Sequence, residues 1–191
     1  MLDHARQSDA MIVITYTIRA DAVAQEYEDW LRRVDCPFFN AAAGVAQYVN
    51  WKVAGGRNVF SPRTYFDFLV MDGIESFDAV WLDPELNAFR RKWRELWGVK
   101  AMPDDGSHAP TYLCRRVASA DMVWTPQVAL LPCDTDSRLA GWDTWRIERP
   151  LRGPSPPFAA LQVRYLSGAD EFGRLSSAPD AAVLGESIAA P

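Results

Sequence analysis

The sequence predicts an α+β fold of the ferredoxin-like type, in which one antiparallel sheet carries two helices on one face. Hydrophobic periodicities follow the order strand, helix, strand, strand, helix, strand over residues 11–117. The strands carry apolar residues at both odd and even positions, which point to opposite faces, so both faces of the sheet must be covered. The C-terminal third repeats features of this unit. We therefore expect a degenerate second repeat and an α/β barrel, formed within one chain or between two copies.

The spacing of hydrophobic residues changes from strand-like alternation to helical spacing between the first strand and the first helix. Residues 11–18 alternate β-branched and aromatic side chains on one face, which predicts a strand. Residues 21–34 place apolar side chains at helical spacing, and Pro37 is expected to end or kink this amphipathic helix. Residues 1–10 are polar and are expected to form a mobile N-terminal tail.

The next two strands cover residues 45–53 and 64–71, on either side of a connection rich in turn residues. Ser76 is a candidate N-cap for the second helix. An Asp-Pro pair at residues 83–84 is expected to restart this helix as cap and first-turn proline, and Gly98 is expected to stop it. Residues 111–117 form the fourth strand. These elements complete the predicted ferredoxin-like domain.

Residues 145–184 repeat the pattern of residues 51–89. In both segments a Ser-Pro pair follows a Trp by ten residues, a Gly precedes a Phe by four, and a Pro follows that Phe by seven. We interpret residues 118–184 as a degenerate second repeat that begins with a strand over residues 123–131 and lacks its first helix and its final strand. Residues 185–191 are then a C-terminal tail. The alternative is an unrelated extension with chance matches.

Composition excludes several classes of function. The 191 residues are 49% hydrophobic, which suffices for a folded core, and the formal net charge of -5 argues against a nucleic-acid partner. No apolar run reaches a membrane span of about 18 residues, and the N-terminus lacks the pattern of a secretory signal, so we expect a cytoplasmic protein without a membrane partner. Three widely spaced Cys and two His predict neither a disulfide framework nor a metal site.

Asp67 is the most unusual candidate residue, because it lies inside an apolar strand between Phe66 and Phe68. A carboxylate is costly at such a position unless it is paired. Burial would raise its pKa toward neutral values that suit a general acid or base. The alternatives are a structural ion pair with an arginine and a solvated position at the rim of the sheet.

Other polar and aromatic residues are candidates to assist. Tyr48 and Asn50 share one face of the second strand and could donate hydrogen bonds to an oxyanion or enolate, or form a polar layer between sheets. Trp51 faces the other way and is a candidate for stacking on substrate. His108 precedes the fourth strand and is a candidate proton shuttle, although a loop histidine is usually solvated.

Four residues of the first strand and helix are candidate substrate contacts. Tyr27 and Trp30 have helical-core spacing, so packing competes with substrate stacking. Tyr16 offers a hydroxyl on the first strand, and Asp35 either contacts substrate or caps nearby backbone amides. The charges of the second helix are expected to form its solvated face: Arg90, Arg91, Lys92, Arg94 and Glu95.

Residues 27–53 and 64–72 resemble the RedY/HapK-like proteins of prodiginine and related bacterial pathways, in the dimeric α/β-barrel superfamily. The shared features are Tyr27-Glu28, Trp30, Asp35 and Pro37 near the end of the first helix, with the acid Asp67 in the third strand. The resemblance covers residues 11–117. Cys36, where such proteins often carry an aromatic residue, and the C-terminal extension depart from it. The extension leaves open a homodimer or an intramolecular pseudo-dimer.

The resemblance implies a tailoring role in secondary metabolism, such as antibiotic biosynthesis, on a small aromatic pyrrole, indole or polyketide intermediate, without a metal or an organic cofactor. Together with Asp67 it favours an enzyme that promotes cyclisation, dehydration or a related proton transfer. One alternative is a cofactor-independent monooxygenase of the same superfamily. The other is a non-catalytic binding or accessory protein for a biosynthetic partner.

Overall fold

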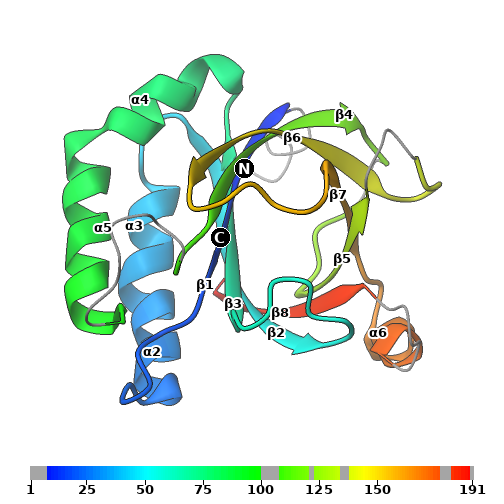
Figure 1. The fold of residues 1–191 in the computed structure, drawn as a ribbon, viewed down its shortest axis with the longest axis horizontal. Helices are drawn as coiled ribbons and strands as arrows, with labels where there is room; N and C mark the ends of the chain where they lie inside the picture. Colours follow the sequence, from blue (N-terminus) through cyan, green and yellow to red (C-terminus); the bar gives the residue numbers. More distant parts are fainter. Residues whose placement is uncertain (1–7, 100–107, 121–122, 134–137, 177–181, 190–191) are drawn as a thin grey trace.

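The computed structural model describes residues 8–99, 108–120, 123–133, 138–176 and 182–189. Its eight strands form a closed antiparallel barrel in the order β1-β3-β2-β8-β5-β7-β6-β4 (Figure 1). The strands are β1 (Ala10–Tyr16), β2 (Val45–Gly55), β3 (Tyr65–Met71), β4 (Thr111–Ala118), β5 (Gln127–Cys133), β6 (Asp143–Arg152), β7 (Ala160–Tyr165) and β8 (Val183–Ala189). The α+β prediction is therefore confirmed, with the barrel closed inside one chain.

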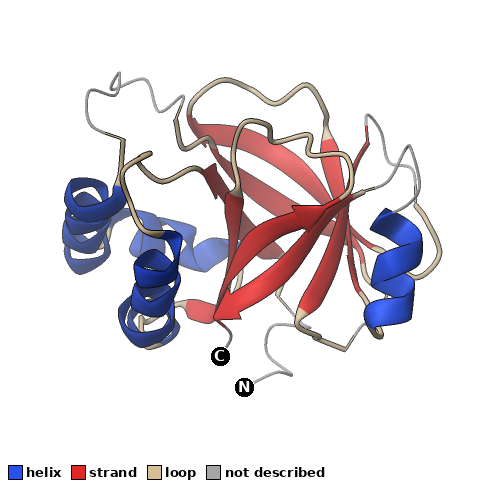
Figure 2. Ribbon diagram, turned by 90° about the horizontal axis from the view of Figure 1, so that it is seen from below, coloured by secondary structure: helices blue, strands red, loops and turns tan. Residues whose placement is uncertain are grey.

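The helices lie on two opposite sides of the barrel (Figure 2). The larger group packs against the sheet made by the first strands, and a single helix, α6, lies on the far side. The helical segments are α2 (Ala24–Trp30), η1 (Leu31–Asp35), α3 (Cys36–Asn40), η2 (Ile74–Ser76), α4 (Phe77–Leu82), α5 (Pro84–Trp97) and α6 (Ala169–Ser176). None of these described helices is long and apolar enough to cross a membrane.

The strand order repeats between the two halves of the chain. The first half contributes β4-β1-β3-β2 and the second half contributes β8-β5-β7-β6, which is the ferredoxin-like order in each case. Pairing of β2 with β8 and of β4 with β6 joins the halves. The architecture is thus consistent with a duplicated ferredoxin-like barrel, while the exact boundary between the repeats stays a prediction.

The end of the chain corrects one expectation. Residues 185–189, predicted to begin a C-terminal tail, instead belong to β8, which pairs with both β2 and β5 and closes the barrel. The pattern was obscured by Gly185, a poor strand former. A Cβ atom there would lie 2.5 Å from Cζ of Phe66, so only glycine lets the strand pass this ring. The packing of the barrel therefore favours the residue that hides the strand in the sequence.

The opposite terminus also differs in part from the predicted tail. Residues 1–7 lie outside the described part of the chain. Ala10 already belongs to β1, and the buried hydroxyl of Ser8 donates to the backbone carbonyl of Met71. The predicted tail therefore does not extend to residue 10.

Two layers of side chains explain why the strands are apolar at both parities. Inward-facing residues such as Trp51, Phe66, Phe68 and Trp145 fill the barrel interior, which is a packed core. Outward-facing residues of β1, β2 and β3 pack against the helices in separate clusters. Asp67 interrupts the second of these layers.

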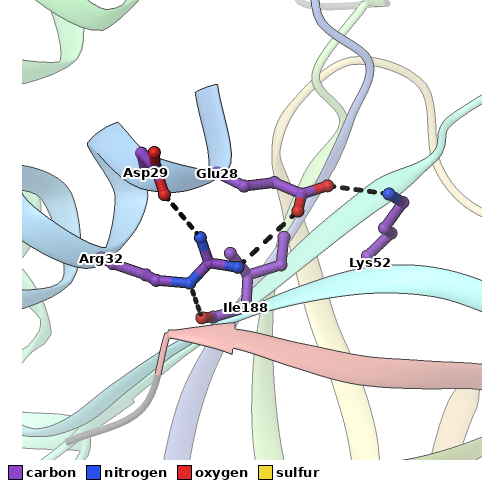
Figure 3. Close-up of polar contacts among 5 residues, drawn as sticks. All are labelled: Glu28, Asp29, Arg32, Lys52 and Ile188. Atoms are coloured by element: carbon purple, nitrogen blue, oxygen red, sulfur yellow. Dashed lines mark hydrogen bonds and ion pairs between the residues drawn. The ribbon is translucent and has the colours of Figure 1, made fainter. Parts of the chain in front are cut away.

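Helix α2 and its continuation η1 are tied to both halves of the barrel by a small polar network (Figure 3). Arg32 Nε donates to the backbone oxygen of Ile188 on β8 at 3.0 Å, and its Nη1 contacts Asp29 at 2.9 Å. Glu28 lies 3.7 Å from Arg32 Nη2 and 2.8 Å from Nζ of Lys52 on β2. The network holds the first helix over the seam where β2 meets β8.

Candidate functional site

A pocket lies between the outer face of the first half-barrel and the helices that cover it. Its empty space of about 670 Å³ includes solvent at its open mouth. Four aromatic side chains from α3, α4 and α5 form its walls: Phe39, Trp81, Phe89 and Trp93. Such walls suit a flat aromatic ligand.

Asp67 lies on the floor of this pocket, at the centre of β3. Register pairs it with Ile14 on β1 and with Asn50 on β2. Because Phe66 and Phe68 point into the barrel, the intervening Asp67 points outward to the helices. Its side chain is only 4% exposed, so a solvated position at the rim is excluded.

Three neutral donors surround the Asp67 carboxyl group. The hydroxyl of Tyr16 donates to Oδ1 at 3.0 Å, and Nδ2 of Asn50 donates to the same oxygen at 3.0 Å. The hydroxyl of Tyr48 donates to Oδ2 at 2.8 Å. The structural ion pair with an arginine is therefore not formed, and uncharged groups from β1 and β2 satisfy the carboxyl instead.

Asp35 reaches the same floor because the first helix does not end where the sequence predicted. A π-helical turn, η1, continues α2 into α3, and Pro37 occupies the first turn of α3, where its missing N–H costs little. Asp35 closes this wide turn and is 2% exposed. It makes no capping bond, and its Oδ2 accepts from Nδ2 of Asn50 at 3.0 Å. The capping role considered for Asp35 is therefore wrong.

Asn50 thus bridges two buried carboxyl groups. Burial raises the pKa of Asp67 to about 8, reinforced by the charge of Asp35 and opposed by the hydrogen bonds from Tyr48, Asn50 and Tyr16. Burial likewise raises the pKa of Asp35 to about 7, opposed by hydrogen bonds from Asn50 and Tyr48. The two groups titrate as a pair, so the pair retains a proton near pH 7 that it can give or accept.

A chain of donors lies behind the pair. The indole Nε1 of Trp93 donates to the hydroxyl of Tyr27 at 3.1 Å, and Tyr27 donates to the hydroxyl of Tyr16 at 2.9 Å. Tyr16 then donates to Asp67. Burial raises the pKa of Tyr16, Tyr27 and Tyr48 well above the ordinary phenol value, so all three remain protonated donors. The chain connects α5 to the carboxyl floor and fixes its geometry.

The remaining predicted residues are divided between the pocket and its surroundings. His108 lines the pocket. Trp30 lies outside the lining and stacks on Tyr27 and Phe89, with ring centres 6.4 and 5.5 Å away. Trp51 is fully buried inside the barrel, on the other side of the sheet, so its predicted stacking on substrate is wrong. Its parity on β2, opposite to Tyr48, already indicated this.

The sequence analysis missed the cationic side of the pocket. Arg90 and Arg94 of α5 line it, and Arg152 reaches it from β6. Arg90 is half-buried, against the expectation of a solvated helix face, whereas Arg94 is exposed as expected. Arg90 and Arg94 are one helical turn apart and flank Trp93 in the sequence. This spacing could have indicated that both arginines lie on the side of the helix near the pocket. Nothing in the sequence indicates Arg152, because β6 joins β4 only through closure of the barrel. The pocket is therefore completed by the second half of the chain.

Metal ligands are not assembled in the described part of the chain. There, no group of three or more His, Cys, Asp or Glu residues is placed to hold a metal ion. The three Cys lie on different elements, Cys36 on α3, Cys114 on β4 and Cys133 on β5. The ionisable and phenolic groups that line the pocket are carboxyl, phenol, imidazole and guanidinium groups.

Comparisons with known proteins agree with this architecture. A solved structure described as an anthrone oxidase-like protein superimposes with a TM-score of 0.54 at 9% identity, over 91% of this chain and 79% of that chain, which shows a shared fold. The comparison with curated proteins gave no match. The family model of the REDY-like protein HapK matches residues 10–102, which contain Asp35, Asn50 and Asp67. Over these residues, just under half of its length, the chain matches the REDY-like HapK family.

Proposed function

We propose that this protein is a tailoring enzyme of secondary metabolism that promotes cyclisation, dehydration or a related proton transfer on a flat aromatic intermediate. The match of residues 10–102 to the REDY-like HapK family supports the metabolic role. The chemistry rests on one observation, the pair of buried carboxyl groups of Asp67 and Asp35 that Asn50 joins at the floor of an aromatic pocket.

A carboxyl pair that holds one proton is suited to reactions in which one proton is taken and another is given. In a dehydration, the ionised carboxyl removes a proton from the carbon next to a carbonyl group. The protonated carboxyl gives its proton to the departing hydroxyl group, the C–O bond breaks, and water leaves as the C=C bond forms. The pair ends with one proton, as it began, so no external acid or base is consumed.

Neighbouring groups stabilise the charge that develops in such a step. Tyr48 lines the pocket and keeps its proton, so its hydroxyl can share that proton between Asp67 and an enolate oxygen of the substrate. Asn50 holds both carboxyl groups at fixed positions. His108 lines the same pocket and is a further candidate for proton exchange with solvent.

The test is turnover of aromatic pathway intermediates by Asp67→Asn and Asp35→Asn variants, followed by liquid chromatography and mass spectrometry. Each substitution should lower turnover at least about 100-fold, because neither amide can carry the transferred proton. Asp78→Asn, which changes an exposed carboxylate of α4, is the control and should keep full activity. A folded Asp67→Asn protein with unchanged turnover contradicts the proposal.

The same assay separates the two alternative functions. Cyclisation and dehydration consume no oxygen, so oxygen uptake that accompanies turnover would indicate a cofactor-independent monooxygenase instead. Tight binding without turnover, and product formation only with a partner enzyme, would indicate an accessory protein.

A further inference from the structure

Two guanidinium groups lie against one indole ring on a side wall of the pocket. The central guanidinium carbon of Arg90 is 4.7 Å from the ring centre of Trp81, and that of Arg152 is 5.4 Å from the same centre. Arg94 lines the pocket one helical turn from Arg90. These positive charges come from α5 and β6, so the fold itself brings them together despite their repulsion.

The contacts of Arg90 and Arg152 do not neutralise this charge. Arg90 Nη1 donates at 3.2 Å to two uncharged acceptors, the backbone oxygen of Trp81 and Oδ1 of Asn87. Arg90 Nη2 is buried and has no hydrogen-bond partner in the described part of the chain. Neither arginine forms an ion pair with a described carboxylate. Asp83, whose charge favours the Arg90 cation, caps α5 by accepting from the backbone N–H of Leu86 at 2.7 Å.

Electrostatics agree with the geometry. Burial, followed by the charge of the neighbouring Arg152, lowers the pKa of Arg90 to about 10, against weaker opposing effects of Tyr48 and Asp83. Burial also lowers the pKa of Arg152, and the positive charge of Arg94 lowers it as a smaller effect. Each cation is therefore held where an added anion would be favourable.

We propose that Arg90 and Arg152 form a carboxylate-binding subsite, and that the ligand of the pocket is an aromatic acid. A carboxylate has two oxygens in one plane and matches the planar fork of a guanidinium, including the buried Nη2 donor of Arg90. This inference rests on the proposed function for the aromatic ring of the ligand, which would lie against the pocket wall that includes Phe39 and Phe89. The acid group then fixes which atom of the ring faces Asp67.

The test compares two probes of equal size, indole-2-carboxylate and the neutral indole-2-carboxamide. Their dissociation constants are measured by isothermal titration calorimetry at low ionic strength. The wild-type protein should bind the carboxylate at least about 10-fold more tightly than the amide. In Arg152→Gln and in Arg90→Gln the two affinities should fall within about twofold of each other, with folding confirmed by circular dichroism.

Arg149→Gln is the matched control. Arg149 lies on the same strand as Arg152 and likewise rests on an aromatic ring, 5.1 Å from the centre of Phe77, but it is exposed and outside the pocket lining. This variant should keep the preference for the carboxylate. A preference lost equally in Arg149→Gln would mean a general effect of net charge and overturn the subsite.

Three other outcomes would test the carboxylate subsite independently of the proposed function. Equal affinity of the wild-type protein for the two probes, binding of neither below about 10 mM, or an unchanged preference in both pocket variants would overturn the carboxylate subsite. The loss of turnover in Asp67→Asn would still stand. Conversely, unchanged turnover in Asp67→Asn would contradict the proton-transfer role and leave a measured carboxylate preference intact.

Discussion

The buried carboxyl pair predicts an unusual dependence of stability on pH. Asp67 has a pKa of about 8 in the folded protein, raised first by burial, against an ordinary value of 3.8. Between these values the folded state binds more protons than the unfolded state, so the free energy of unfolding must fall as pH rises. The stabilising contribution is complete below about pH 4 and is lost as pH increases through about 8.

The magnitude follows from the number of protons released. One proton contributes about 1.4 kcal/mol per pH unit, so from pH 5 to pH 7 the wild-type protein should lose about 2 to 3 kcal/mol relative to Asp67→Asn. Asparagine keeps the size of the side chain and cannot ionise. Asp35, with its own raised pKa, remains in both proteins and adds to both curves.

Urea unfolding at pH 5, 6, 7 and 8, followed by circular dichroism, measures this difference. The Asp78→Asn variant, altered at an exposed carboxylate, corrects for the loss of one acidic residue and should follow the wild-type curve. If the wild-type and Asp67→Asn curves stay parallel over this range, Asp67 is ionised in the folded protein throughout, and the reasoning from burial is refuted.

Two further predictions concern the donors around Asp67 and the closure of the barrel. Tyr16→Phe removes a hydrogen bond that favours the ionised carboxyl, so the carboxyl titration seen by ¹³C NMR should move up by about one pH unit; an unchanged titration would show that this bond does not hold the charge. Gly185→Ala places a Cβ atom 2.5 Å from Phe66 and should cost about 1 to 3 kcal/mol in urea unfolding. Gly173→Ala on α6, where a Cβ atom meets nothing within 4 Å, should cost nothing, and equal effects of the two substitutions would contradict the steric argument.

Periodicity was sufficient for most of the fold. Strands at residues 45–55 and 65–71 lie close to their predicted limits, because apolar alternation and turn residues act locally. Asp83 caps α5 and Pro84 begins it, as the Asp-Pro pair indicated. The strand at residues 183–189 was missed, because its glycine is required by a ring on a distant strand.

The candidate site was predicted in part, because some of its residues stand out in the local pattern of their own strands. Asp67 was recognisable as a carboxyl group in an apolar strand, and Tyr48 and Asn50 as polar neighbours on one face of another strand. Asp35 could not be paired with Asp67 from the sequence, because a π-helical turn places it and such a turn has no clear local signature. Arg152 could not be assigned to the pocket at all.

The sequence by itself determined the α+β class, the apolar layers on both faces of the sheet and the presence of one buried acid, since these follow from the order and type of neighbouring residues. Only the tertiary structure decided that the barrel closes within one chain, that the acid is one of two, and that Arg152 completes the pocket. The physical reason is that these three features depend on contacts between segments far apart in the chain. Strand pairing and helix packing create those contacts, and the raised pKa values of the pair arise from the burial that they produce.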